Sequence, residues 1–306
     1  MKVKHICILL IILSFGIESC VKKNLKAIDD NNKAYDPDIS LNQIFFSKIV
    51  DGNSDIFKIN IDGSEVKNIT NSFNKSEFYP AISHDAKRIA FASGDRLFQS
   101  AIDGTDEIEI TNNSIFSTKS FTPTYLSWSD KSNFITFQDQ EFGDKHYIDS
   151  QYDTKIKRSL TKVFEGDGFS SYNLSFSPVE AKVVFTYTEQ PLGGTKMGIS
   201  SLEGFESDLI WIDQFGLHPQ YFKDGSKLLY IGNESIDMID IDGENKKNLV
   251  LIESDISGFS ASPDGTQIVY SSNISGNYEL YILTIDSKEV TQLTNTVEDE
   301  LHPFWN

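Results

Sequence analysis

The chain has 306 residues, 39% of them hydrophobic, and a formal net charge of −18 at pH 7. Such a charge repels phosphate, which argues against binding nucleic acid and against lying flat on anionic lipid. The two cysteines, Cys7 and Cys20, stand near the amino terminus, so residues 21–306 contain no thiol for a disulfide or a cysteine metal site.

Residues 1–20 have the order of an export signal. Lys2 and Lys4 precede an apolar run at 6–15, which is too short to span a bilayer. The sequence "IESC" that ends at Cys20 resembles the cleavage box of bacterial lipoproteins, which implies cleavage before this cysteine and a lipid on its sulfur. An ordinary secretory signal with an incidental cysteine is the alternative.

The residues that follow Cys20 favour a domain anchored in the cell envelope. Residue 21 is Val rather than Asp, which by the same resemblance favours the outer membrane, with the domain facing the periplasm or the cell surface. Residues 21–40 are polar and have no regular period, so we expect a flexible tether between the lipid and a domain at 41–306. Contact with the membrane is then expected through the lipid alone.

From residue 41 onward the sequence repeats. An aromatic residue recurs at intervals of 40 to 48 residues. The clearest copy, residues 259–294, divides into four short strand patterns, with a Pro-Asp-Gly turn between the first two. Four strands per copy at this period predict a β-propeller, because each unit buries its faces only against units of its own kind. The recurring aromatic residues, each in a predicted second strand, are Phe46, Phe91, Phe137, Phe185, Tyr230 and Tyr270.

The repeat resembles that of a known family. Its pattern is P-x-x-S-P-D-G-x-x-I-x-Y/F, then E-L/I-Y, then D-G, then L-T, as in "SPDGTQIVY" at 262–270 and "QLT" at 292–294. This pattern resembles the TolB-type, WD-like propeller repeat over roughly residues 41–306. The resemblance implies an all-β fold, and the six copies predict a single six-bladed propeller with four-stranded blades. It leaves the function open, since such propellers serve as binding proteins and as accessory domains of enzymes.

The two ends of the domain complement each other. Residues 301–306, "LHPFWN", have the pattern of a first strand without a second strand after it. Residues 41–47, "LNQIFFS", have the pattern of a second strand without a first strand before it. Pairing of the two would complete one blade and close the ring without a free edge. We therefore expect a ring closed by its N- and C-terminal strands.

The long connections are expected to lie on one face of the propeller. Loops between second and third strands share that face with the connections between blades, and irregular loops on a rigid scaffold commonly carry binding residues. These segments are residues 112–122, 138–145, 162–171, 188–196, 273–277 and 295–300. Their carboxylates include Glu165, Asp167, Glu298, Asp299 and Glu300, which would attract a basic protein or peptide; plain solvation of the surface is the alternative.

Two histidines occupy matching places in the repeat. His218 and His302 each precede a proline, as Tyr79 does, and Thr122-Pro123 is taken as a further equivalent. This position opens the innermost strand and is expected to border the mouth of the central channel. A pair of histidines there suits a divalent metal, but a metal needs more convergent ligands than the sequence places there, so packing of a His-Pro consensus element is favoured. Trp128 and Trp305 also match each other, which favours packing between blades over stacking on a sugar.

No catalytic motif emerges from the sequence. A G-x-S-x-G nucleophile elbow is absent, and the S-x-D-x-G-x-x-W spacing of sialidase Asp boxes is absent as well. We therefore expect a monomeric, non-enzymatic binding scaffold without cofactor or metal, whose partner is a protein or peptide of the envelope. Its candidate binding face contains Tyr79, His218, His302 and the carboxylates named above. The alternative is a carbohydrate-active propeller, a lyase or hydrolase, that uses the channel mouth.

Overall fold

The computed structural model describes residues 42–111, 123–129, 134–139, 145–149, 157–159, 169–189, 195–201, 210–212 and 214–306. These residues form strands, turns and bends, and contain no helix. The strands are β1 (Gln43–Val50), β2 (Asn53–Asn60), β3 (Lys67–Asn68), β4 (Glu77–Ile82), β5 (Arg88–Ser93), β6 (Arg96–Ala101), β7 (Ile108–Glu109), β8 (Pro123–Trp128), β9 (Phe134–Asp139), β10 (Lys145–Asp149), β11 (Lys157–Ser159), β12 (Phe169–Phe176), β13 (Lys182–Glu189), β14 (Thr195–Ser201), β15 (Ile210–Ile212), β16 (Leu217–Tyr221), β17 (Lys227–Ile231), β18 (Ser235–Asp240), β19 (Lys247–Leu251), β20 (Ile256–Ala261), β21 (Gln267–Ser272), β22 (Glu279–Thr284), β23 (Val290–Gln292) and β24 (Asp299–Trp305).

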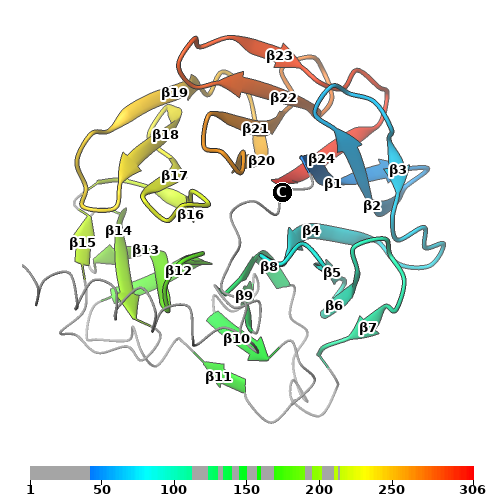
Figure 1. Cartoon of the computed structure of the whole chain (residues 1–306), viewed down its shortest axis with the longest axis horizontal. Helices are drawn as coiled ribbons and strands as arrows, with labels where there is room; N and C mark the ends of the chain where they lie inside the picture. The colour runs from blue at the N-terminus through cyan, green and yellow to red at the C-terminus, as the bar shows by residue number, and fades with distance from the viewer. Residues whose placement is uncertain are drawn as a thin grey trace, which may run out of the picture.

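The strands pair into antiparallel four-stranded sheets. Within the described residues there are six: β4–β7, β8–β11, β12–β15, β16–β19, β20–β23, and one in the order β24-β1-β2-β3. Figure 1 shows the sheets arranged around a common centre, with β4, β8, β12, β16, β20 and β24 innermost. The predictions of an all-β propeller and of four-stranded blades are confirmed, and β20 to β23 coincide with the four strands expected in the clearest copy.

The last strand of the chain joins the first. β24 pairs with β1, with Trp305 opposite Ile44 and Phe304 opposite Phe45. Backbone hydrogen bonds join Gln43 and Asn306 in both directions, at 3.0 and 3.1 Å. One sheet is therefore built from both ends of the described domain (Figure 1).

The core lies between neighbouring sheets. All six recurring aromatic residues are buried, and the most exposed of them, Tyr270, retains 7% of its surface. Trp128 is buried as expected, and its indole N–H donates to the carbonyl of Ala81 on the preceding sheet at 2.9 Å. Trp305 is buried too, whereas Trp211 on β15 is 47% exposed. The repeat therefore marks the packing positions between the sheets.

The Asp-Gly turns between third and fourth strands follow a single design. Gly63, Gly104 and Gly243 have φ values of +82°, +89° and +88°. In each turn the preceding aspartate accepts a hydrogen bond from the backbone N–H two residues later, at 3.0 Å where Asp103 accepts from Thr105. Glycine adopts a positive φ without steric cost, and the aspartate satisfies a turn amide, which explains this choice of residues.

A matched pair of glycine variants tests the turn at Gly104. A Cβ on Gly104 would lie 2.1 Å from the backbone oxygen of Ile69, whereas a Cβ on Gly52, at φ +81°, would meet nothing within 4 Å. Both Gly→Ala changes incur the left-handed penalty of about 1–2 kcal/mol. We expect Gly104→Ala to lower the free energy of unfolding further, by roughly 3 kcal/mol or more in total. Equal losses in urea titrations of the two variants would contradict this packing.

Candidate functional site

The innermost strands all carry an irregularity in their register. Each shifts register against its neighbour, at Phe78/Ala81, Thr124/Ser127, Tyr172/Ser175, Leu217/Gln220, Ile256/Gly258 and, for β24, at the β1 residues Phe45/Ser47. In five of the six described strands a non-glycine residue stands there at positive φ: Tyr79 (58°), Tyr125 (54°), Asn173 (55°), His218 (52°) and His302 (51°). We call these five the bulge residues. A β-bulge redirects a side chain, and left-handed residues other than glycine concentrate at functional sites.

The structure agrees with the sequence analysis for three bulge residues and adds two that the sequence analysis did not name. Tyr79, His218 and His302 occupy equivalent places, as expected. In β8 the residue at that place is Tyr125, and Thr122 lies outside the described residues. The equivalence of Trp128 and Trp305 predicts that Tyr125 matches His302, since each tryptophan lies three residues after its bulge residue. Asn173 was missed because no proline follows it.

The bulge residues bring aromatic rings together from different sheets. The centroids of the Tyr79 and His302 rings lie 4.0 Å apart, and those of Tyr79 and Tyr125 lie 5.8 Å apart. Tyr125 also stacks on His218 at 4.2 Å, and its hydroxyl lies 3.2 Å from Nε2 of that histidine. Four rings from β24, β4, β8 and β16 thus form one continuous cluster at the centre of the ring.

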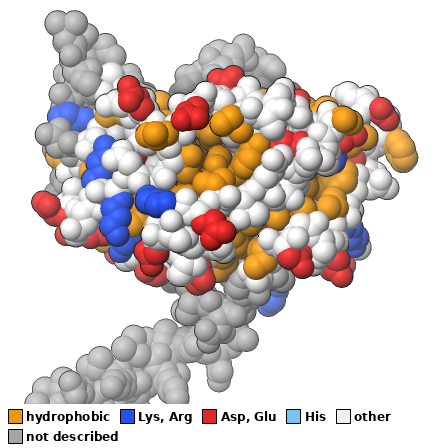
Figure 2. Space-filling view, turned by 90° about the horizontal axis from the view of Figure 1, so that it is seen from above, with side chains coloured by type: hydrophobic (Ala, Val, Ile, Leu, Met, Phe, Trp, Pro, Cys, Tyr) orange, Lys and Arg blue, Asp and Glu red, His pale blue; other side chains and the backbone are white. Residues whose placement is uncertain are grey.

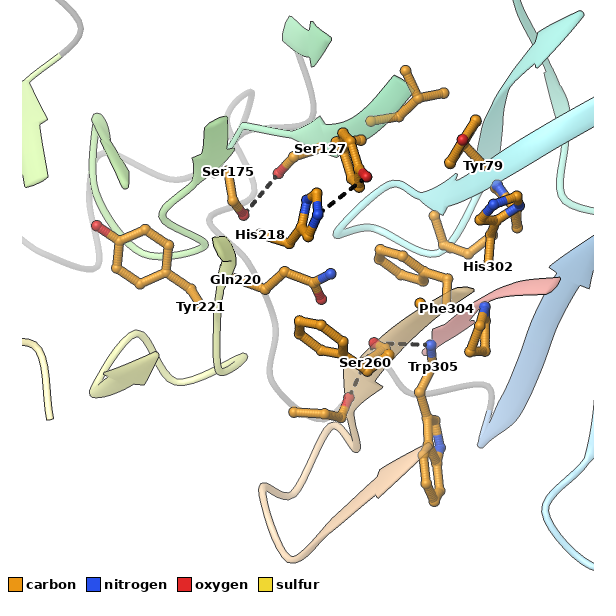
Figure 3. A pocket seen from close by; sticks show the side chains of 18 of the residues that line it. Tyr79, Ser127, Ser175, His218, Gln220, Tyr221, Ser260, His302, Phe304 and Trp305 are labelled. Carbon is orange, nitrogen blue, oxygen red and sulfur yellow. Dashed lines mark hydrogen bonds between the residues drawn. The ribbon is translucent and has the colours of Figure 1, made fainter. Parts of the chain in front are cut away.

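A cavity of about 190 Å³ adjoins this cluster. Each innermost strand contributes residues from its register shift toward its end, among them Ser127, Ser175, Gln220, Ser260 and Phe304 (Figure 3). Prolines follow three of the bulge residues and line the cavity as well: Pro80, Pro219 and Pro303. None of the described residues that line it is Asp or Glu. Lys223 also lines it, and its Nζ donates to Asn306 Oδ1 at 3.0 Å, so the rings and prolines of the lining suit an uncharged group that packs on them.

Burial keeps the two imidazoles of the cluster uncharged. It lowers the pKa of His218 to about 4 and the pKa of His302 to about 3. Burial also raises the pKa of the Tyr79 and Tyr125 hydroxyls, so these remain protonated donors. Nδ1 of His218 and Nδ1 of His302 have no hydrogen-bond partner among the described residues. At neutral pH the cluster is therefore uncharged.

The acidic candidates separate into different environments. Glu298 remains partly exposed, with its carboxylate 3.4 Å from Lys48 Nζ, and Asp299 accepts a hydrogen bond from the Tyr278 N–H at 2.9 Å. Glu300 is fully buried within β24, so its expected role as an exposed attractor of basic partners is wrong. Side chains alternate between the faces of a strand, and the start of β24 turns this one inward. Glu165, Asp167 and Cys20 lie outside the described residues.

Charge is dispersed over the side of the molecule that Figure 2 shows. Acidic side chains are scattered over this side, and hydrophobic side chains are gathered in its middle. Within the described ranges no group of three or more His, Cys, Asp or Glu side chains is arranged to hold a metal ion. No helix in that part of the chain is long and apolar enough to cross a membrane.

Comparison with known proteins concerns the fold. No family model matches the sequence, and no curated protein matches it either. TolB from Acinetobacter baumannii superposes with a TM-score of 0.68 at 17% identity, over 86% of this chain and 66% of that one. A putative TolB from Agrobacterium tumefaciens gives 0.61 at 16% identity, over 82% and 88%. An oligogalacturonate lyase solved with manganese gives 0.55 at 11% identity, over 80% and 87%.

These likenesses support the resemblance seen in the repeat. The chain spans about two thirds of the length of the Acinetobacter protein, and it covers most of the Agrobacterium protein. Identities this low establish architecture rather than activity. The fold of this chain is the TolB-type β-propeller.

Proposed function

We propose that this protein is a non-enzymatic binding scaffold whose central cavity receives one uncharged side chain of a partner protein or peptide. The observation that supports this most is the set of five bulge residues, which direct aromatic, imidazole and amide side chains toward one cavity. Ligand pockets for whole small molecules usually measure about 300–1,000 Å³, and an apolar cavity of about 150 Å³ accepts benzene. A cavity of about 190 Å³ thus matches a single aromatic side chain.

Glu298 and Asp299 would favour basic residues beside that anchor. Hydrogen bonding from Thr296 and the charge of Lys48 lower the pKa of Glu298, so this side chain stays ionised. Exposed carboxylates accelerate the approach of a basic segment, and salt screens them. Glu298 and Asp299 retain this role in the proposal, and Glu300 does not, because it is buried. Association is then expected to weaken as salt rises.

Selection from a random peptide library on the immobilised protein tests the proposal. We expect enriched peptides that combine an aromatic residue with neighbouring Lys or Arg. Tyr125→Ala and His218→Ala should each weaken binding of a selected peptide by roughly tenfold or more, as for residues that contact an anchor. Phe73→Ala is the matched control, because Phe73 is 89% exposed and does not line the cavity. Equal loss in the control, or enrichment without aromatic residues, would contradict the proposal.

The proposal extends to the state of the domain and its place in the cell. We propose a monomer, a ring of six blades closed by β24 and β1, and an envelope location through a lipid on Cys20, facing the periplasm or the cell surface. Pairing of β24 with β1 supports the closed ring. The basic start, the apolar run and the "IESC" sequence support the anchor.

Replacing the proposed lipid site should release the protein. In Cys20→Ser cells, we expect the protein in the soluble fraction, because a thioether lipid cannot form and the tether offers no other membrane contact. Fractionation and immunoblotting measure this, and Cys7→Ser is the matched control, which should stay with the membrane. Equal membrane recovery of Cys20→Ser and wild type would contradict the anchor.

A carbohydrate-active enzyme is the second candidate. It is favoured by two uncharged imidazoles in the cavity beside Gln220, and by the likeness in fold to oligogalacturonate lyases. Incubation with oligogalacturonates and Mn²⁺, followed by the ultraviolet absorbance of unsaturated products, tests it. Turnover that disappears in His218→Ala and His302→Ala would replace the binding proposal.

A further inference from the structure

Two carboxyl pairs flank the sheet that contains both ends of the domain, and only Asp55 among their four members is partly exposed. At one junction Glu300 on β24 faces Glu279 on β22, and at the other Glu77 on β4 faces Asp55 on β2. Glu77 and Glu300 are fully buried, and Glu279 is 1% exposed. Burying two carboxylates side by side is costly unless one of them carries a proton.

The contacts around Glu300 leave room for such a proton. Its Oε1 accepts from Thr296 Oγ1 at 2.7 Å and lies 2.9 Å from Lys48 Nζ on β1. Glu279 Oε1 accepts from the Thr296 N–H at 2.7 Å. The other oxygen of each, Oε2, is buried without a hydrogen-bond partner among the described residues. A proton shared between the two carboxyls supplies the missing donor for these oxygens.

The second pair repeats the arrangement with different donors. Glu77 oxygens lie 2.7 Å from Ser72 Oγ and 3.1 Å from Thr70 Oγ1. Ser72 Oγ also lies 2.7 Å from the Lys75 carbonyl and 3.3 Å from Asp55 Oδ1, and one hydroxyl hydrogen cannot serve all three acceptors. Asp55 already accepts two other hydrogen bonds, from Asn68 Nδ2 at 2.6 Å and from the Ser72 N–H at 3.1 Å. The proton therefore belongs on Glu77, which then donates.

One glutamate of each pair lies two residues before a ring of the cavity cluster. Glu77 precedes Tyr79 and Glu300 precedes His302, and these two rings stack at 4.0 Å. A serine hydroxyl donates to the backbone carbonyl of each glutamate, from Ser54 Oγ to Glu77 O at 2.8 Å and from Ser271 Oγ to Glu300 O at 2.5 Å. These hydrogen bonds hold each glutamate in place two residues before its bulge residue.

We propose that Glu77 and Glu300 are positioning residues, each holding a proton shared with the neighbouring carboxyl, and that these protons fix the Tyr79–His302 stack at the cavity. Loss of either proton places two negative charges at a junction between sheets. Their repulsion pushes the first residues of that innermost strand away from the neighbouring sheet. The cavity would then be widened or distorted at its ring cluster. This inference goes beyond the proposed function and does not depend on any ligand.

The direction of the pH effect follows from the burial of both groups. Desolvation raises the pKa of Glu77 from 4.5 to about 7, and it does the same for Glu300, to which the neighbouring Glu279 adds. Between about pH 4.5 and about pH 7 the folded protein thus binds more protons than the unfolded chain, so stability falls as pH rises through this window. Lys48 and, through it, Glu298 are the other charges at Glu300, and Lys75 near Glu77 is paired with Glu107.

Nuclear magnetic resonance of the full domain tests the proposal without a ligand. The His302 ring resonances should shift between about pH 6 and about pH 8, although this imidazole itself stays uncharged over that range. Glutamine mimics the protonated carboxyl, so Glu300→Gln and Glu77→Gln should each reduce the shift, and the double variant should abolish it. Glu253→Gln removes an exposed acid between β19 and β20 and should leave the shift unchanged.

Carboxyl ¹³C resonances of the wild-type protein keep the proposal testable if a glutamine variant fails to fold. Two glutamate carboxyls should titrate near pH 7, far above the rest. Urea midpoints should fall from about pH 5 to about pH 7 in wild type and in Glu253→Gln, and stay level in the double glutamine variant. Titration of every carboxyl below about pH 5, or a His302 shift that persists in the double glutamine variant, would overturn the proposal.

Discussion

Deleting residues 301–306 is expected to abolish cooperative folding. The deletion removes β24 except its first two residues, and so unpairs β1 along the positions Ile44, Phe45 and Ser47. It also removes Trp305, which is 4% exposed, and the partly buried Phe304 that packs on two core clusters. Losing a buried tryptophan alone costs about 3–5 kcal/mol, against a total stability of about 5–15 kcal/mol for a typical domain.

Calorimetry and the amount of soluble protein measure this outcome. Trp305→Ala separates the lost packing from the exposed strand edge, and we expect it to lower the free energy of unfolding by about 3–5 kcal/mol. Trp211→Ala is the matched control, because Trp211 is 47% exposed and should cost far less. A truncated protein with an unchanged melting curve would show that the pairing of β24 with β1 does not hold the fold.

A second large effect is expected at the recurring aromatic position. Phe91 is fully buried and stacks on Phe98 of the next strand, with centroids 5.8 Å apart. Phe91→Ala leaves a cavity between two sheets, so we expect a loss of about 3–5 kcal/mol.

Phe73 provides the control for that measurement. It belongs to the same residue type but is 89% exposed, so Phe73→Ala should change the free energy of unfolding by less than about 0.5 kcal/mol. Urea titrations of both variants give the comparison. Similar losses for the two would contradict the packing assigned to the repeat.

The sequence predicts the architecture because each repeat uses the same packing positions. Three features depend on short-range geometry: the recurring aromatic residues, the Asp-Gly turns and the strand patterns of 259–294. The same features recur from one copy to the next. Burial of Trp128 follows from the same phase of the repeat. Because the copies share one pattern, each copy supports the strand assignment made in the others.

The candidate site is predicted less completely, for a physical reason. A β-bulge changes which side chain faces inward, and strand patterns alone do not locate it. Three bulge residues were identified because proline follows them, whereas Tyr125 and Asn173 have no such mark. Glu300 was assigned to a loop, and only the pairing of β24 with β1 and the facing Glu279 show that it is buried.

The most direct test of the central claim is to locate the anchor of a selected peptide on the protein. With the aromatic side chain of the peptide isotopically labelled, nuclear Overhauser contacts report which protein rings lie beside it. We expect contacts to the rings of Tyr125, His218 and His302, all of which line the cavity. Contacts confined to residues outside the cavity, such as Phe73 or Trp211, would contradict the assignment of the cavity as the binding site.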